Sequence, residues 1–157
     1  MNRKLGITHF SVLTAFVLVM LFVLAACAPA ASESSEKPAR PSNAGGAGPA
    51  VNLTGDANKG AVVFTTNCVS CHGDQGKVGI PNPGSKDGTI PNLNPIDPTL
   101  VSADMKVYAT NIDLYIEHGS TPEGDKPTLK MLPFGDQKIL APQEIADVIA
   151  YVISLNK

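Results

Sequence analysis

The sequence lacks the features of a nucleic-acid-binding, repetitive or β-rich protein. Its 12 Lys and Arg side chains are outnumbered by 14 Asp and Glu side chains. Without residues 1–26, which hold two basic residues and no acidic one, 10 basic and 14 acidic side chains remain, a formal charge of −4. This balance argues against nucleic acid as a partner. We find no internal repeat and no clear alternation of apolar and polar residues, so the sequence predicts helices and loops.

Cysteine is also scarce, with three residues in the chain, and no disulfide is expected. Two of the three stand in the motif Cys68-Val69-Ser70-Cys71-His72. Cys-x-x-Cys-His is the spacing that attaches a haem covalently. Cys68 and Cys71 would form thioethers with the haem vinyl groups, and His72 would ligate the iron. The motif therefore predicts one covalently bound haem c.

Two other interpretations of the motif are weaker. A structural zinc site needs four ligands, typically cysteine and histidine side chains. Beyond the motif, residues 27–157 offer only His118 and Cys27. A thioredoxin-like pair would lie between a strand and a helix, whereas Gly73 and a proline-rich segment follow this motif.

The N-terminus predicts export and lipidation. Arg3 and Lys4 precede an apolar run from Phe10 to Ala26, which is the pattern of a signal peptide. Leu24-Ala25-Ala26-Cys27 resembles a bacterial lipobox, so residues 1–26 are expected to be removed and Cys27 lipidated. An uncleaved transmembrane anchor is the alternative. Both place the remainder at the extracytoplasmic face of a bacterial membrane.

The next segment is predicted to be a linker. Residues 27–54 begin with the lipidated cysteine and continue as a stretch rich in Pro, Gly, Ser and Ala, with no apolar periodicity. Such a composition buries too little apolar surface to order itself. We therefore expect a flexible linker and a single folded domain over residues 55–157.

The domain is predicted to be all-α, with three or more helices around the haem and long proline-rich loops. The first helix is expected from Asp56 to about Thr66, with Asp56 or Thr54 as its cap. Apolar spacing predicts a middle helix over residues 111–118 that ends at Gly119, and a last helix from Pro142 to about Leu155. Ala141 would cap the last helix without an acceptor, at a cost of about 1 kcal/mol. Five prolines divide residues 77–100 into turns, a loop long enough to wrap a haem.

Residues 55–157 resemble the class I c-type cytochromes. The matching pieces are Gly60-x-x-x-Phe64, Cys68-Val69-Ser70-Cys71-His72-Gly73, Pro91-Asn92-Leu93, the helix ending at Gly119, Met131 with Pro133-Phe134, and the last helix with Tyr151. The resemblance implies that the first and last helices cross, with Gly60 and Phe64 meeting the Tyr151 region. It also implies that the Pro91 carbonyl accepts a hydrogen bond from His72 and that Leu93 packs on the haem face.

The sixth ligand of the iron has three candidates. Met1 and Met20 belong to the signal segment, which leaves Met105 and Met131. The resemblance favours Met131, because the family places its distal methionine in the loop before the last helix. Leu132 separates Met131 from Pro133, a departure from the usual Met-Pro pair. His118 is a rival, although a surface histidine interacting with a helix C-terminus is the simpler interpretation.

Function follows from the expected ligation. Histidine and methionine together leave no open position on the iron and suit one-electron transfer. We predict a membrane-tethered monohaem electron carrier of a bacterial respiratory or photosynthetic chain. It would either shuttle or belong to a quinol-oxidising assembly similar to alternative complex III, and Lys77, Lys126 or Lys130 would steer an acidic redox partner. The alternatives are a haem enzyme subunit or gas sensor with a labile sixth ligand, and a lipoprotein without haem.

Overall fold

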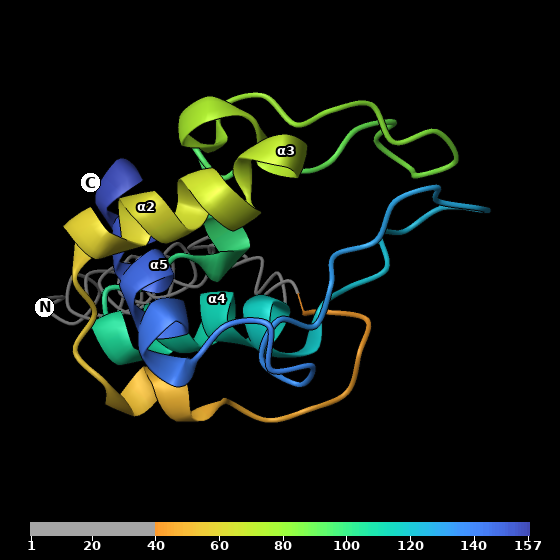
Figure 1. Ribbon diagram of the computed structural model, residues 1–157. Coiled ribbons are helices and arrows are strands. Elements are labelled where there is room, and N and C mark those ends of the chain that lie inside the picture. Colours follow the sequence, from red (N-terminus) through yellow and green to blue (C-terminus); the bar gives the residue numbers. More distant parts are fainter. Residues whose placement is uncertain (1–39) are drawn as a thin grey trace, which may run out of the picture. The chain divides into compact units, whose positions relative to one another are not determined.

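Helices account for most of the regular structure in residues 40–157, the part of the chain that the computed structural model describes (Figure 1). The α-helices are α2 (Ala57–Asn67), α3 (Val69–His72), α4 (Met105–His118) and α5 (Pro142–Leu155). Three 3-10 turns accompany them in this part of the chain: η2 (Pro49–Asn52), η3 (Asp74–Gly76) and η4 (Pro98–Leu100).

The predicted all-α class is confirmed. Within residues 40–157 the only extended pairings are two isolated bridges, Pro81 with Thr89 and Ser120 with Met131. No helix in that part of the chain combines the length and apolar character needed to cross a bilayer. The predicted signal peptide and Cys27 lie outside the described residues.

Two predicted helix starts are confirmed by their caps. The Asp56 carboxylate accepts hydrogen bonds from the Asn58 and Lys59 backbone N–H groups at 2.9 and 3.4 Å, which starts α2. Helix α5 begins at Pro142 as expected, after Ala141. Ala141 has no acceptor, but Glu144 accepts a hydrogen bond from the Ala141 N–H at 2.7 Å, so half of a capping box is present.

The start of α4 was predicted too late. The helix begins at Met105 rather than Asn111, because Asp104 caps it by accepting from the Lys106 and Val107 N–H groups at 2.8 and 3.3 Å. Met105 and Val107 are 52% and 47% exposed. Residues 105–107 therefore place no side chain in the core, and the buried stripe of the helix begins only with Tyr108.

Helices α2 and α5 cross at close range, as the resemblance implied. A Cβ atom on Gly60 would lie 2.0 Å from the Asp147 backbone oxygen, so only glycine fits at the crossing. Beside it the rings of Phe64 and Tyr151 pack with centroids 5.3 Å apart and planes inclined by 58°. The crossing fixes the end of α2, and with it the start of the cysteine motif.

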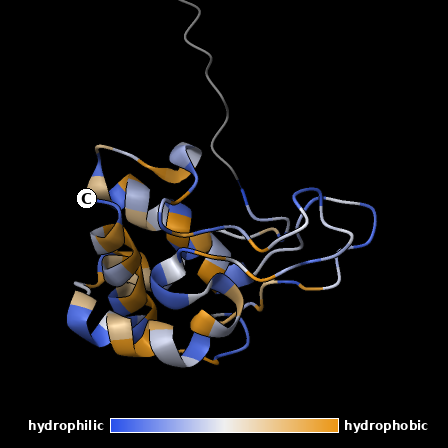
Figure 2. Ribbon diagram, turned by 90° about the horizontal axis from the view of Figure 1, so that it is seen from above, coloured by the Kyte–Doolittle hydropathy of each residue, from blue (hydrophilic) through white to orange (hydrophobic). Residues whose placement is uncertain are grey.

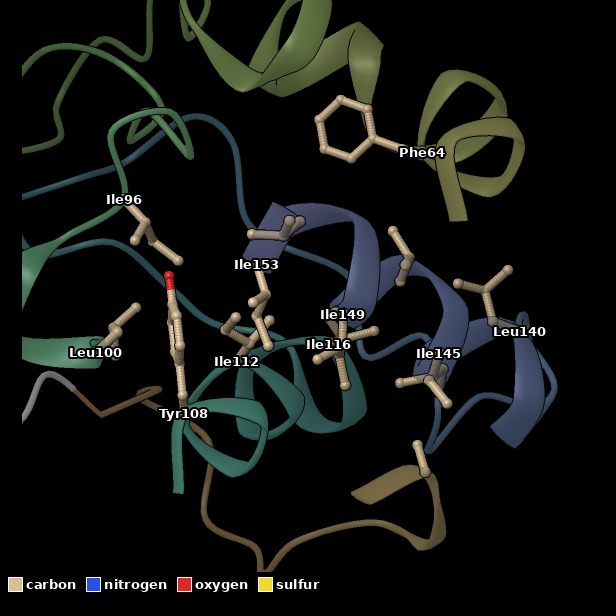
Figure 3. Close-up of a cluster of buried hydrophobic side chains, with 14 residues drawn as sticks. Phe64, Ile96, Leu100, Tyr108, Ile112, Ile116, Leu140, Ile145, Ile149 and Ile153 are labelled. Carbon is tan, nitrogen blue, oxygen red and sulfur yellow. The ribbon is translucent and has the colours of Figure 1, made fainter. Parts of the chain in front are cut away.

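The core lies between α4, α5 and the segments that flank them (Figure 3). Helix α5 contributes the largest share, and Ile145 and Val148 are each only 1% exposed. The residues of this buried cluster are Ala50, Phe64, Ile96, Leu100, Tyr108, Ile112, Ile116, Leu140, Ile145, Ala146, Val148, Ile149, Val152 and Ile153.

The predicted linker is partly wrong. Residues 40–54 lie against the domain, and Ala50 in η2 is only 1% exposed. The Gly48 N–H donates to the Asp113 carboxylate at 2.7 Å, and the Gln143 side-chain amide donates to the Thr54 carbonyl at 2.9 Å. Composition misled the prediction, because glycines and alanines that suggest a flexible chain also allow close backbone contact with α4.

Two loops project from the helices and pair with each other. Asn82, which is 0% exposed, donates to the Leu129 carbonyl at 3.1 Å and accepts from the Leu129 N–H at 2.8 Å. At the tips, Lys86 and Glu123 form an exposed ion pair at 3.1 Å. These projecting loops carry mainly hydrophilic residues (Figure 2). The proline-rich segment is therefore held by a second loop, residues 120–131.

Candidate haem site

The cysteine motif forms one tight turn directly after α2. Cys68 ends α2 and caps α3, and its carbonyl accepts hydrogen bonds from the Cys71 and His72 N–H groups at 3.1 and 2.9 Å. Because residues three apart in a helical turn share a face, the turn presents the two thiols on one side. Both thiols are free and half-buried.

The environment of Cys68 differs from that of a reactive dithiol. Burial, and secondarily the neighbouring Cys71, raises the pKa of the Cys68 thiol to about 11. The cysteine of a thioredoxin-like pair instead has a lowered pKa that favours the thiolate. In the polypeptide without its cofactor Cys68 therefore stays protonated, which argues against the dithiol interpretation.

His72 is oriented by the segment that the sequence singled out. Its Nδ1 lies 2.9 Å from the Pro91 carbonyl oxygen, so the predicted contact is present, with Nδ1–H donating. Burial lowers the pKa of His72, and the bond to Pro91 opposes this shift. The imidazole is therefore neutral, with its lone pair on Nε2, the arrangement of a metal-ligating histidine whose other nitrogen is fixed by a carbonyl.

Leu93 lies next to the turn that follows His72. Its N–H donates to the Gly76 carbonyl at 2.8 Å, and its own carbonyl accepts from the Asn156 side-chain amide at 2.9 Å. The side chain packs against the edge of the core. The Gly79 N–H also donates to the Asn92 side chain at 3.1 Å, so the Pro91-Asn92-Leu93 segment is bonded to the stretch that follows the cysteine turn.

Met131 is held beside the end of α4. Ser120 and Met131 exchange two backbone hydrogen bonds of 3.2 and 2.8 Å. Gly119 has a φ of 66°, and a Cβ atom there would lie 2.4 Å from the Met131 carbonyl oxygen. The Met131 side chain packs against the core, whereas Leu132 is 52% exposed. The extra residue before Pro133 thus turns outward and leaves Met131 facing inward.

The two rivals of Met131 occupy unsuitable positions. Met105 is exposed on the first residue of α4. His118 has both ring nitrogens engaged, Nδ1 with the Asp136 carboxylate at 2.9 Å and Nε2 with the Gly46 carbonyl at 2.7 Å. Both partners are acceptors, so both nitrogens carry hydrogen and neither has a lone pair for iron. His118 is the last residue of α4, as expected, and its side chain is 11% exposed, less than a freely solvated surface residue.

One buried polar group was not identified from the sequence. The Tyr108 hydroxyl is buried and has no hydrogen-bond partner among the described residues, and in Figure 3 it points toward Ile96. An unpaired buried hydroxyl is costly. The groups that fit a haem at the cysteine motif are the two free thiols of Cys68 and Cys71 and the imidazole nitrogen of His72.

The zinc alternative finds no ligand set in the described part of the chain. Across residues 40–157, no three His, Cys, Asp or Glu side chains gather in an arrangement that would hold a metal ion. A structural zinc site requires four such ligands.

Comparison with known proteins agrees with this geometry. Residues 57–156 match the family described as Cytochrome c. The cbb3-type cytochrome c oxidase subunit FixP of Rhizobium meliloti (strain 1021) is 34% identical over 101 residues, which is 62% of this chain and 29% of that protein. The same subunit of Sinorhizobium medicae (strain WSM419) gives equal values. The chain thus spans less than a third of these relatives, and no solved structure matches.

The family match covers more than half of the chain and begins and ends with the helices α2 and α5 that enclose the cysteine turn. The chain belongs to the cytochrome c family, contains a domain for covalently bound haem c, and is of the electron-transferring c type.

Proposed function

We propose that this protein is a membrane-tethered monohaem cytochrome c that carries single electrons at the extracytoplasmic face of a bacterial membrane. Cys68 and Cys71 bind the haem, and His72 and Met131 ligate its iron. When bound, the haem supplies a ferric and ferrous couple. The observation that carries the proposal is the His72–Pro91 contact of 2.9 Å, which leaves Nε2 as the free ring nitrogen.

The protein's own residues set the conditions for electron transfer. Pro91 fixes the orientation of the imidazole and raises its basicity. A methionine in the sixth position raises the potential relative to nitrogen ligands and closes the coordination sphere. Met131 is the methionine that the fold holds against the core, by the paired hydrogen bonds with Ser120.

Absorption spectra of the haem-loaded protein test the ligation. We expect a low-spin spectrum with the weak ferric sulfur-to-iron band, and no change when carbon monoxide is added to the ferrous form. Met131→Ala should abolish the band and admit carbon monoxide, whereas the matched control Met105→Ala should behave as the wild type. A wild-type protein that is high-spin and binds carbon monoxide would instead support the alternative, a haem enzyme subunit or gas sensor with a labile sixth ligand.

The tether is tested separately. We expect labelled fatty acid to be incorporated in cells at Cys27 and to be absent from Cys27→Ser, with the variant released from the membrane fraction. A Cys27→Ser protein that stays in the membrane without label would favour the uncleaved N-terminal anchor.

The partner is proposed to be a multisubunit electron-transfer complex. Both relatives are named as subunits of a cbb3-type cytochrome c oxidase, which supports such a place. The complex would be either an oxidase or a quinol-oxidising assembly similar to alternative complex III. Stable co-purification with membrane subunits in mild detergent is expected for a fixed subunit, and elution as a monomer is expected for a shuttle. Lys77, Lys126 and Lys130 are exposed and available to an acidic partner.

A further inference from the structure

Residues 42–48, here called the arm, run along the end of α4 before they reach η2 (Figure 1, orange). The Thr121 N–H donates to the Ser42 hydroxyl at 2.6 Å, and the Ser42 N–H donates to the Ser120 hydroxyl at 3.3 Å. The Asn43 side-chain amide donates to the His118 carbonyl at 2.5 Å. The first part of the arm therefore contacts the residues that immediately follow α4.

The second part of the arm is held by side chains of α4. His118 Nε2 donates to the Gly46 carbonyl at 2.7 Å, and the Gly48 N–H donates at 2.7 Å to Asp113, which is 0% exposed. The fit is close, because a Cβ atom on Gly45 would lie 2.1 Å from His118 Nε2. Gly46 differs, since a Cβ atom there would meet nothing within 4 Å.

Residues at the end of α4 and just after it also hold the loop that carries Met131. Ser120, bonded to the arm, exchanges two backbone hydrogen bonds with Met131. On the other side of Met131, the Asp136 N–H donates to the Glu117 carbonyl at 3.0 Å, and the Asp136 carboxylate accepts from His118 Nδ1. Both ends of the Met131 loop and the arm thus meet at residues 117–121.

We propose that the arm is a positioning element for the sixth ligand: by clamping residues 118–121 it keeps the Met131 loop in the conformation that places the thioether on the iron. This inference rests on the proposed ligation by Met131. An iron–thioether bond is retained only while the loop stays in place, and residues that orient a ligand typically change metal affinity 10–100-fold when removed. Gly45, Ser42 and His118 act through Met131 and do not touch the iron.

The matched variants Gly45→Ala and Gly46→Ala test the inference in the full haem-loaded protein. Gly45→Ala forces the arm away from the His118 ring, whereas Gly46→Ala adds the same methyl group in open space. We expect Gly45→Ala to weaken the ferric sulfur-to-iron band and to raise the rate of carbon monoxide binding to the ferrous haem about tenfold or more. Gly46→Ala should retain the wild-type band and rate.

A double variant removes two of the arm's side-chain contacts without adding strain. Ser42→Ala with Asn43→Ala deletes the hydrogen bond from the Thr121 N–H to the Ser42 hydroxyl and the bond from the Asn43 amide to the His118 carbonyl. This variant tests the inference independently if Gly45→Ala does not fold. We expect the same direction of change in band and rate. Rates and bands equal to wild type in the double variant, or in a Gly45→Ala protein that only melts earlier, would overturn the inference. Rapid carbon monoxide binding by the wild type, equal to that of Met131→Ala, would instead overturn the ligation itself.

Discussion

At the scale of single residues, His118 is hydrogen-bonded through both ring nitrogens. The bond to the Gly46 carbonyl, followed by the Asp136 carboxylate, raises the pKa of His118 above its usual 6.5. Glu117 also faces the ring and favours the charged form. Asp113, the other carboxyl on this side of α4, has a pKa raised mainly by burial. The imidazolium thus links the arm to Asp136.

This charge predicts how stability depends on pH. A pKa raised in the folded state means that the folded protein binds the proton more tightly, so the stabilisation is complete below about pH 6.5 and is lost as pH rises through the folded-state pKa. We expect the free energy of unfolding of the haem-loaded protein to fall from pH 6.5 upward, and His118→Gln to show a flatter profile. Denaturant titrations at several pH values measure both. If the free energies of unfolding of wild type and His118→Gln changed in parallel with pH, His118 would not bind its two acceptors in its charged form.

Single residues were predictable where neighbours in the sequence determine them. Cys68, Cys71 and His72 followed from one spacing, and the contact of His72 with Pro91 followed from the family resemblance. The role of His118 did not, because its acceptors come from Gly46 and Asp136, which are 72 and 18 residues away in the sequence. The unpaired hydroxyl of Tyr108 could not be predicted either, because the sequence does not show which buried groups lack a hydrogen-bond partner.

At the scale of elements, the crossing of α2 and α5 is the contact most sensitive to one methyl group. Gly60→Ala would place a Cβ atom 2.0 Å from the Asp147 carbonyl oxygen, so the helices must separate. We expect a loss of about 2 kcal/mol or more, beyond the roughly 1 kcal/mol that alanine gains in helix propensity. Denaturant unfolding measures it, with Lys59→Ala on the exposed face as the control. A Gly60→Ala protein as stable as that control would contradict the close crossing.

In helix α5, by contrast, a single substitution is expected to stabilise the protein. Ala141 has the extended backbone of a capping residue, φ −70° and ψ 155°, but no side-chain acceptor. Ala141→Ser should supply one to the first turn and complete the capping box with Glu144, raising the free energy of unfolding by about 1 kcal/mol. A melting temperature higher by about 4 °C is the expected readout, while Ala141→Gly leaves the turn uncapped. No gain over the glycine variant would show that Glu144 already satisfies this end.

The bounds of a helix could be predicted from the sequence where a continuous apolar face marks it. Helix α5 was located from end to end because a continuous stripe and Pro142 mark it. The start of α4 was missed because the side chains of residues 105–107 are exposed. The order of residues 40–54 was missed because small residues carry no apolar pattern even when they pack closely.

At the scale of the whole molecule, Asn82 joins the two projecting loops through Leu129, with its side chain fully buried. Asn82→Ala leaves both Leu129 backbone groups without these partners, a cost of about 1–3 kcal/mol. We expect residues 81–89 and 120–131 to separate and to be cleaved faster by proteases, with the helices intact. Lys86→Ala, which removes only an exposed ion pair, is the control and should change little. Equal cleavage of the two variants would contradict the role of Asn82.

The docking of the arm to α4 also shortens the free segment that would join the domain to a lipid on Cys27. If Cys27 carries the lipid, only residues 28–41 separate it from the first clamped residue, Ser42. Fully extended, those residues span at most about 50 Å, roughly half the reach of a linker that ran freely to residue 54. With that tether the haem would stay in a layer beside the membrane surface. Its exchange partners would have to bring their own redox centres into that layer, which would favour a neighbour in the same membrane over a protein diffusing freely outside.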